Sequence, residues 1–115
     1  MDWLGSGEGT MLAAVPAGDP EAALLGYAVL RSHPAGPSWD VGELVGEIET
    51  LAVLPAARGR GVGSALLDAG RERFRGEGLE WWSVAVVEAN SGAVALYRHA
   101  GFEPYYRNLL GRIAD

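Results

Sequence analysis

A glycine-rich turn between a strand-like and a helix-like segment constrains this chain more than any other feature. Residues 51–53 are apolar, Pro55 then interrupts the strand, and helical sequence begins soon after the turn. The turn holds three glycines: Gly59, Gly61 and Gly63. Glycine lets the backbone approach a ligand closely, and the free N–H groups of a helix start carry partial positive charge. The segment therefore predicts a cradle for a pyrophosphate group.

The spacing of these glycines distinguishes between kinds of phosphate loop. A Walker loop requires a lysine, and this chain contains none. A dinucleotide fingerprint requires GxGxxG, but the last position is Ser64 or Leu66 in the two available registers. The pattern that remains is Arg58-x-x-Gly61-x-Gly63 after a strand. The alternative is a turn whose glycines serve only the fold.

Residues 90–102 contain a second recognisable pattern. It consists of an asparagine, an alanine three positions later, a Leu-Tyr pair at 96–97 and a closing Gly-Phe pair. The asparagine or the following serine can cap a helix, and the closing glycine falls where helices often end in a left-handed residue. With the glycine turn before it, this pattern resembles the GNAT family of N-acetyltransferases. The resemblance covers about residues 45–105, the half of the fold that binds the cofactor in that family.

Periodicity and turn residues agree with the fold that the resemblance implies, an α/β mixed sheet. Antiparallel strands are expected first, followed by a β-α-β-α-β order in which the strands flanking the first helix are parallel. We expect strands at 10–15, 24–31 and 44–53, a helix at 61–76, a strand at 80–87, a helix at 91–100 and a strand at 102–110. The family's usual first strand and two helices are shortened or missing, because only residues 1–9 precede the first expected strand. Residues 1–115 are expected to form a single GNAT-like domain.

The resemblance implies acetyl-CoA as co-substrate and no metal. The pyrophosphate is expected to contact Arg58, Gly59, Arg60, Gly61, Val62, Gly63 and Ser64. The pantetheine arm is expected in a gap where two strands splay apart, pairing with the backbone of Leu51, Ala52 and Val53. Asn90 is expected to contact the pantetheine amides, or to act as a helix cap. Three arginines lie too far along the helix to reach a phosphate and are expected on its solvated face: Arg71, Arg73 and Arg75.

Acetyl transfer from a thioester to an amine needs a base for the amine and a proton for the leaving thiolate. Glu47 and Glu49 alternate along a strand, so both should point to one face unless a bulge intervenes. In the family a glutamate on this strand often acts as the base. The family also places a tyrosine at the position of Tyr97, with its hydroxyl near the cofactor sulfur. The alternatives are a half-exposed strand for the glutamates and a packed aromatic ring for Tyr97.

Charge and composition limit the kinds of molecule that this chain is expected to bind. The net charge is −6, and the residues before Arg58 include eight acidic side chains but only one basic side chain, Arg31. An acidic surface disfavours nucleic acid and favours cationic partners such as amines. The chain has no cysteine, and its histidines, His33 and His99, are isolated, so neither a disulfide framework nor a metal site is indicated. Neither a leader peptide nor a membrane span is indicated, so we expect a cytoplasmic protein.

These expectations combine into one function, an N-acetyltransferase that moves an acetyl group from acetyl-CoA to a primary amine of a small molecule or a protein. The resemblance implies that one wall of the family's acceptor site is missing here or reduced to residues 1–9. Together with the apolar stretch near the C-terminus, this favours a homodimer that completes the site. The alternative is a non-catalytic CoA-binding sensor or partner subunit. Tyr97 and the paired glutamates argue against that alternative, because a silent site does not need them.

Overall fold

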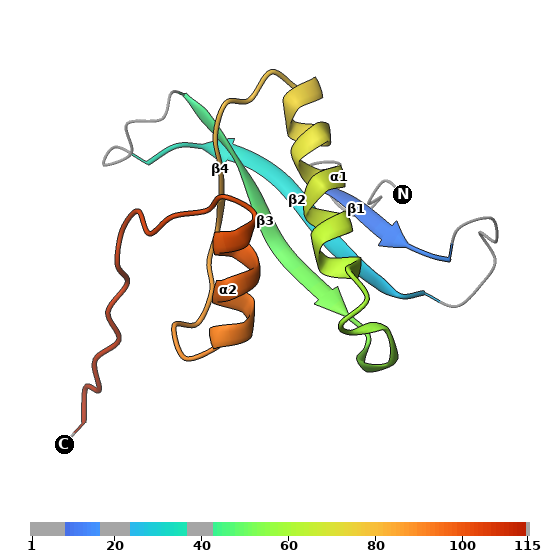
Figure 1. The fold of residues 1–115 in the computed structure, drawn as a ribbon. Coiled ribbons are helices and arrows are strands. Elements are labelled where there is room, and N and C mark those ends of the chain that lie inside the picture. The colour runs from blue at the N-terminus through green and yellow to red at the C-terminus, as the bar shows by residue number, and fades with distance from the viewer. Residues whose placement is uncertain (1–8, 17–23, 37–42, 115) are drawn as a thin grey trace.

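The computed structural model describes residues 9–16, 24–36 and 43–114 (Figure 1). In chain order the elements are β1 (Gly9–Ala14), β2 (Gly26–Pro34), β3 (Leu44–Val53), the 3-10 helix η1 (Pro55–Ala57), α1 (Val62–Gly76), β4 (Trp82–Val84) and α2 (Ser91–His99). Residues 1–8, where a shortened N-terminal wall was expected, lie outside the described part of the chain.

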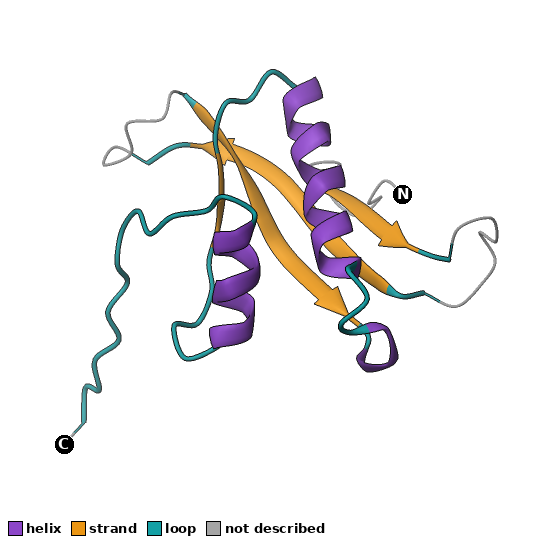
Figure 2. Ribbon diagram, viewed as in Figure 1, coloured by secondary structure: helices purple, strands orange, loops and turns teal. Residues whose placement is uncertain are grey.

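The strands form one mixed sheet in the order β1-β2-β3-β4 (Figure 2). β2 pairs antiparallel with β1 and with β3, whereas β3 and β4 are parallel. α1 makes the crossover between the two parallel strands, as such a connection requires. The expected α/β mixed sheet is therefore confirmed, including the change from antiparallel to parallel pairing.

A β-bulge interrupts β3 where it pairs with β2. Val29 lies opposite Thr50 and Leu30 lies opposite Ile48, so Glu49 has no partner in the register. A bulge bends the strand that carries it and increases its twist. The parallel pairing of β3 with β4 ends at Ile48, directly before the bulge. Beyond this point the two strands are no longer joined.

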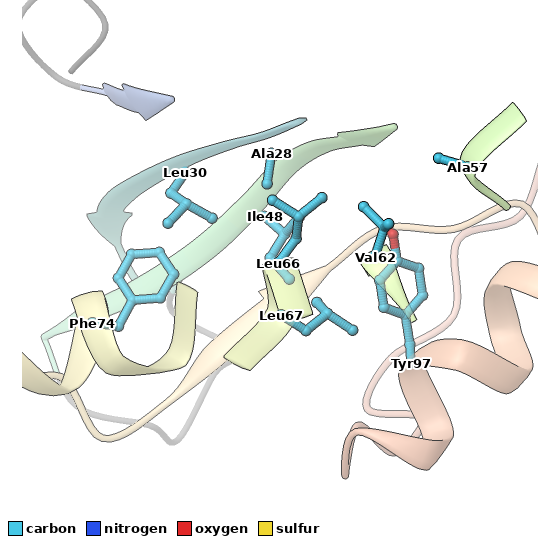
Figure 3. Packing of buried hydrophobic residues seen from close by; sticks show 9 residues of the cluster. All are labelled: Ala28, Leu30, Ile48, Ala57, Val62, Leu66, Leu67, Phe74 and Tyr97. Carbon is cyan, nitrogen blue, oxygen red and sulfur yellow. The ribbon is translucent and has the colours of Figure 1, made fainter. Parts of the chain in front are cut away.

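An apolar stripe on α1 holds this helix against the sheet. Its buried residues recur at helical spacing: Val62, Gly63, Leu66, Leu67, Gly70 and Phe74. The apolar side chains among them, at 62, 66, 67 and 74, meet Ala28 and Leu30 of β2 and Ile48 of β3 in the main core (Figure 3). Tyr97 of α2 joins the same cluster beside Val62 (Figure 3). Both helices therefore gain their stability by burying apolar surface in one shared core.

Gly46 is a point of close approach between β3 and α1. A Cβ atom at this position would lie 2.9 Å from ring atoms of the buried Phe74. We expect Gly46→Ala to lower the free energy of unfolding by about 1–3 kcal/mol, because the added methyl group overpacks the core. Urea denaturation measures this loss, and adding Phe74→Leu should restore part of it. An unchanged midpoint for the single variant would contradict the expected clash.

Two expected strands differ from the structure. The strand expected at 80–87 is limited to Trp82–Val84, because β3 offers only Gly46–Ile48 for parallel pairing. The strand expected at 102–110 is wrong, since residues 103–110 have no regular structure and lead away from the sheet (Figure 1). A strand needs a neighbour for its backbone hydrogen bonds, and the short β4 offers little edge. Pro104 also removes a backbone donor.

Arg71 does not lie on the solvated face where the sequence placed it. Its guanidinium carbon is 5.2 Å from the ring centre of Trp82, close enough for a cation–π contact. Its Nη2 donates a hydrogen bond to the carbonyl of Ala100. Arg71 therefore ties α1 to the end of α2. Arg73 and Arg75 form ion pairs on the exposed surface of α1, as expected.

Candidate active site

The divergence of β3 from β4 opens a cleft of about 290 Å³. One wall is residues 48–51 of β3, and the facing wall is residues 84–87. Asn90, Ala93 and Tyr97 of α2 and its N-terminus complete the lining. The gap that the sequence placed between these strands is therefore present, and it begins at the bulge.

The glycine turn leads into an open helix start. Gly59 and Gly61 have φ angles of 77° and 79°, and a Cβ atom on either would meet nothing within 4 Å among the described residues. Gly61 is the N-cap of α1, no side chain caps this helix, and its first turn contains no acidic residue. The first N–H groups of the helix are therefore not shielded by a capping side chain, which is the arrangement that favours an anion.

Other residues of the turn also serve the fold. A Cβ atom on Gly63 would lie 3.1 Å from Leu96, so this glycine lets α1 and α2 pack closely. The Nε of Arg58 donates to the carbonyl of Val53 at 3.3 Å, which ties the turn to the end of β3. Arg60 is exposed. The contacts expected between these residues and a pyrophosphate stay predictions.

The remaining residues expected at the cofactor occupy different environments. Leu51 lines the cleft. Ala52 and Val53 pair with β2 and are not among the lining residues. Val62 is buried in the core, and Ser64 is exposed on the first turn of α1. The cleft therefore brings Leu51 together with α2 but leaves the turn residues outside its lining.

Asn90 is the N-cap of α2. Its Oδ1 accepts a hydrogen bond from the backbone N–H of Ala93 at 3.1 Å, so the capping role is confirmed. Asn90 also lines the cleft. The cap uses the amide oxygen and leaves the amide nitrogen for another acceptor, so one side chain can both cap the helix and face a ligand.

Tyr97 combines a packed ring with an accessible hydroxyl. The ring lies edge-on to Phe102, with 5.8 Å between centroids, and the residue lines the cleft. Among the described residues, none forms a hydrogen bond with the Tyr97 hydroxyl and no buried side-chain oxygen lacks a partner. The hydroxyl is therefore reached by solvent. Burial raises the pKa of Tyr97 above its ordinary value, so the phenol holds its proton at neutral pH.

Glu47 and Glu49 approach the same arginine. Arg31 lies opposite Glu47 on β2, and its Nε donates to Glu47 Oε1 at 3.0 Å. The same Nε is 3.5 Å from Glu49 Oε2. His33 Nε2 lies 3.5 Å from Glu47 Oε1. Glu49 lines the cleft and Glu47 does not, so the two glutamates occupy different positions despite their shared partner.

The sequence did not assign Arg31 or His33 to the site, nor the exposed apolar side chains of Val86 and Val87 that line the cleft. The signal for Arg31 was its isolation as the one basic residue in an acidic region. Its contact with Glu47 depends on the register between β2 and β3, which the sequence does not give. Val86 and Val87 were expected in a paired strand, which hid their place in the cleft.

The model of the acetyltransferase (GNAT) family matches residues 2–102. The chain belongs to the GNAT family. The match includes both motifs on which the resemblance was based, so that identification from the sequence is confirmed.

Curated relatives of this GNAT chain include two mycothiol acetyltransferases. The protein from Saccharomonospora viridis is 40% identical over 83 residues, which cover 72% of this chain and 27% of the relative. The protein from Stackebrandtia nassauensis is 39% identical over 101 residues, which cover 88% and 30%. The chain thus spans less than a third of the length of these relatives.

Solved structures share the GNAT fold. An aminoglycoside N-acetyltransferase in complex with CoA aligns with a TM-score of 0.77 and 20% identity, covering 94% of this chain and 78% of that structure. The aminoglycoside antibiotic 6'-N-acetyltransferase of Acinetobacter haemolyticus aligns with a TM-score of 0.75 and 17% identity, covering 94% and 72%. At these identities the likeness concerns the fold.

Residues 9–16, 24–36 and 43–114 contain no cluster of three or more acidic or histidine side chains that could hold a metal ion. Within the same ranges, no helix combines the length and apolar character needed to span a bilayer. The homodimer and the cytoplasmic location are not tested by the structure and stay predictions.

Proposed function

We propose that this GNAT chain transfers an acetyl group from acetyl-CoA to a primary amine. The observation that carries the proposal is the cleft between β3 and residues 84–87, because it holds a carboxylate, Glu49, and a protonated phenol, Tyr97, in one lining. Tyr97 of the cleft and Val62 of the first turn of α1 belong to one buried cluster, which supports a cofactor site that runs from the cleft to the helix start. The same fold binds CoA in an aminoglycoside N-acetyltransferase.

The proposed cofactor contacts follow the groups that the protein leaves open. The uncapped start of α1 at Gly61 offers N–H groups to the pyrophosphate, and Arg60 adds positive charge from the exposed turn. The pantetheine amides fit the unpaired edge of β3 at Leu51. Asn90 faces the same cleft. These contacts would place the thioester near Glu49 and Tyr97.

The proposed reaction is a direct attack of the amine on the thioester. Glu49 accepts a proton from the ammonium group of the acceptor, directly or through a water. The neutral nitrogen then bonds to the carbonyl carbon, and the carbon–sulfur bond breaks. The leaving thiolate takes a proton from the Tyr97 hydroxyl, and the excess proton of the amide nitrogen passes to solvent. Exchange with solvent returns Glu49 and Tyr97 to their starting states.

For the acceptor we propose a small cationic amine. The chain has a net charge of −6, and the residues beside the cleft include two carboxylates but one guanidinium. Such a surface attracts positively charged molecules and repels acidic ones. The names of relatives with this fold, mycothiol acetyltransferase and aminoglycoside N-acetyltransferase, also point to small molecules. A protein amine is the alternative acceptor.

A thiol-release assay tests this function with little background. Because the chain has no cysteine, the protein adds no thiol of its own, and Ellman's reagent detects the CoA thiol released from acetyl-CoA. Acetyl-CoA is incubated with tobramycin, with spermidine or with a peptide that has a free N-terminus, and release is expected with a small cationic amine. Release with the peptide alone would overturn the proposed acceptor class. CoA binding without release would favour the non-catalytic alternative, and no CoA binding would overturn both.

Glu49→Gln tests the proposed base. We expect kcat to fall about tenfold near neutral pH, because the amide cannot accept the amine proton. The deficit should shrink at higher pH, where more of the amine is already neutral. Glu43→Gln is the matched control, since Glu43 is an exposed carboxylate directly before β3. Equal turnover by wild type and Glu49→Gln at all pH values would exclude Glu49 as the base.

A further inference from the structure

We propose that Arg31 is a positioning residue that links Glu47 to Glu49 and so fixes the Glu49 carboxylate at the cleft. This inference rests on the proposed acetyl transfer, in which Glu49 is the base. It adds a residue that neither motif contains, on a strand that neither motif covers. Arg31 lies on β2, whereas both motifs lie after the start of β3.

The geometry places one guanidinium between two carboxylates. Arg31 and Glu47 are directly opposite each other across the antiparallel β2–β3 pair, where cross-strand side chains are in contact. Arg31 Nε is 3.0 Å from Glu47 Oε1 and 3.5 Å from Glu49 Oε2. The first contact is a charge-assisted hydrogen bond. The second holds the Glu49 carboxylate by charge attraction.

The two glutamates have different surroundings, which divides their roles. Glu47 has the more covered side chain, 25% exposed, and it also faces His33 Nε2 at 3.5 Å. Glu49 is 43% exposed, lines the cleft and lies in the bulge without a cross-strand partner. Glu47 therefore anchors the guanidinium, and the guanidinium restrains a carboxylate that the sheet register leaves unpaired.

Stability alone does not account for this arrangement. Arg31 is 46% exposed, and ion pairs at such positions contribute little to the free energy of folding because water screens them. The acidic region before Arg58 carries a single basic residue, and that residue contacts both Glu47 and Glu49. Holding a general base in a productive position, by contrast, has a large effect on rate.

The first test separates kcat from binding. With the amine that is turned over in the thiol-release assay, Arg31→Ala should lower kcat about tenfold, while the dissociation constant for CoA stays within about twofold. Arg31→Lys should recover part of kcat, because it keeps the charge but lacks the planar fork. Arg75→Ala is the control, because it breaks an exposed ion pair on α1. Wild-type kcat in Arg31→Ala would overturn the proposal.

A double-variant cycle tests the link between the residues. If Arg31 acts through Glu47 and Glu49 as one unit, Arg31→Ala should cause little further loss of kcat in a Glu47→Gln background. Fully additive losses would overturn the linkage. Both results presuppose turnover by the wild-type protein.

An NMR measurement addresses the linkage without an acceptor. The Arg31 Nε–Hε signal, assigned by its loss in Arg31→Lys, should exchange slowly with water and should shift in Glu47→Gln and in Glu49→Gln. A signal that neither substitution changes would overturn the proposed link between Arg31 and the two glutamates. The wild-type protein could bind CoA and show an Arg31 signal that shifts in both glutamine variants, but turn over no amine. The proposed function then fails, and the link between Arg31 and the two glutamates stands.

Discussion

Gly61→Asp is expected to lower the affinity for CoA by roughly 100-fold or more. Gly61 has a φ angle of 79°, a conformation that costs a side-chain-bearing residue about 1–3 kcal/mol. Aspartate would also place a negative charge at the uncapped start of α1, where the pyrophosphate is proposed to bind. Calorimetric titration of CoA and acetyl-CoA into both proteins measures the loss.

The chain supplies a closely matched control for this substitution. Gly78 also has a φ angle of 79°, and in the part of the chain that the structure describes a Cβ atom there would likewise meet nothing within 4 Å. It lies beyond the opposite end of α1. Gly78→Asp therefore introduces similar strain and the same charge outside the turn, and it should bind CoA with wild-type affinity. Equal losses in the two variants, or unchanged affinity in Gly61→Asp, would contradict the proposed cradle.

Tyr97→Phe is expected to lower kcat about 100-fold while leaving CoA affinity nearly unchanged. The substitution keeps the ring that packs against Phe102 and removes only the hydroxyl that solvent reaches. The leaving thiolate would then lack its proposed proton donor. Steady-state kinetics in the thiol-release assay measure the effect, with Tyr106→Phe as a control because Tyr106 is 67% exposed in the C-terminal segment. Wild-type kcat in Tyr97→Phe would assign Tyr97 to packing alone.

The same variant also has an effect on stability that depends on pH. Burial raises the pKa of Tyr97, so the folded state holds the phenolic proton more tightly than the unfolded state. This contribution is present below the ordinary tyrosine pKa of 10.0 and is lost as the pH rises through the folded-state pKa. Between pH 10.0 and the folded-state pKa, urea denaturation should show a steeper loss of stability in wild type than in Tyr97→Phe. Parallel curves would contradict the raised pKa.

The sequence predicted the turn before α1 and the two helices well, because these segments contain residues with specific backbone demands. Glycines at positive φ marked the turn before α1, and Asn90 marked the start of α2 through a side-chain cap. These are local properties, so a short segment is enough to reveal them. The same is true of the apolar stripe on α1, which follows the helical period.

The features that could not be predicted from the sequence depend on which strands pair and in what register. The bulge at Glu49 ends the pairing with β4, so the strand expected at 80–87 stops after three residues. Arg31 meets Glu47 only through the β2–β3 register. Arg71 is not on the solvated face expected from the sequence, because it contacts Trp82 and the end of α2. Such contacts are non-local, and no pattern within one segment encodes them.

The short parallel pairing between β3 and β4 makes these strands easier to separate than the other strands of the sheet. Only three residue pairs join these strands, Gly46–Ile48 with Trp82–Val84, whereas β2 and β3 are paired along nearly their whole length. Local opening requires the least free energy where the fewest backbone hydrogen bonds must break. In hydrogen exchange the amides of β4 should therefore lose protection before those of β2. A ligand that contacts both walls of the cleft would hold β3 and β4 together. It would therefore slow hydrogen exchange in β4 even without contacting that strand directly.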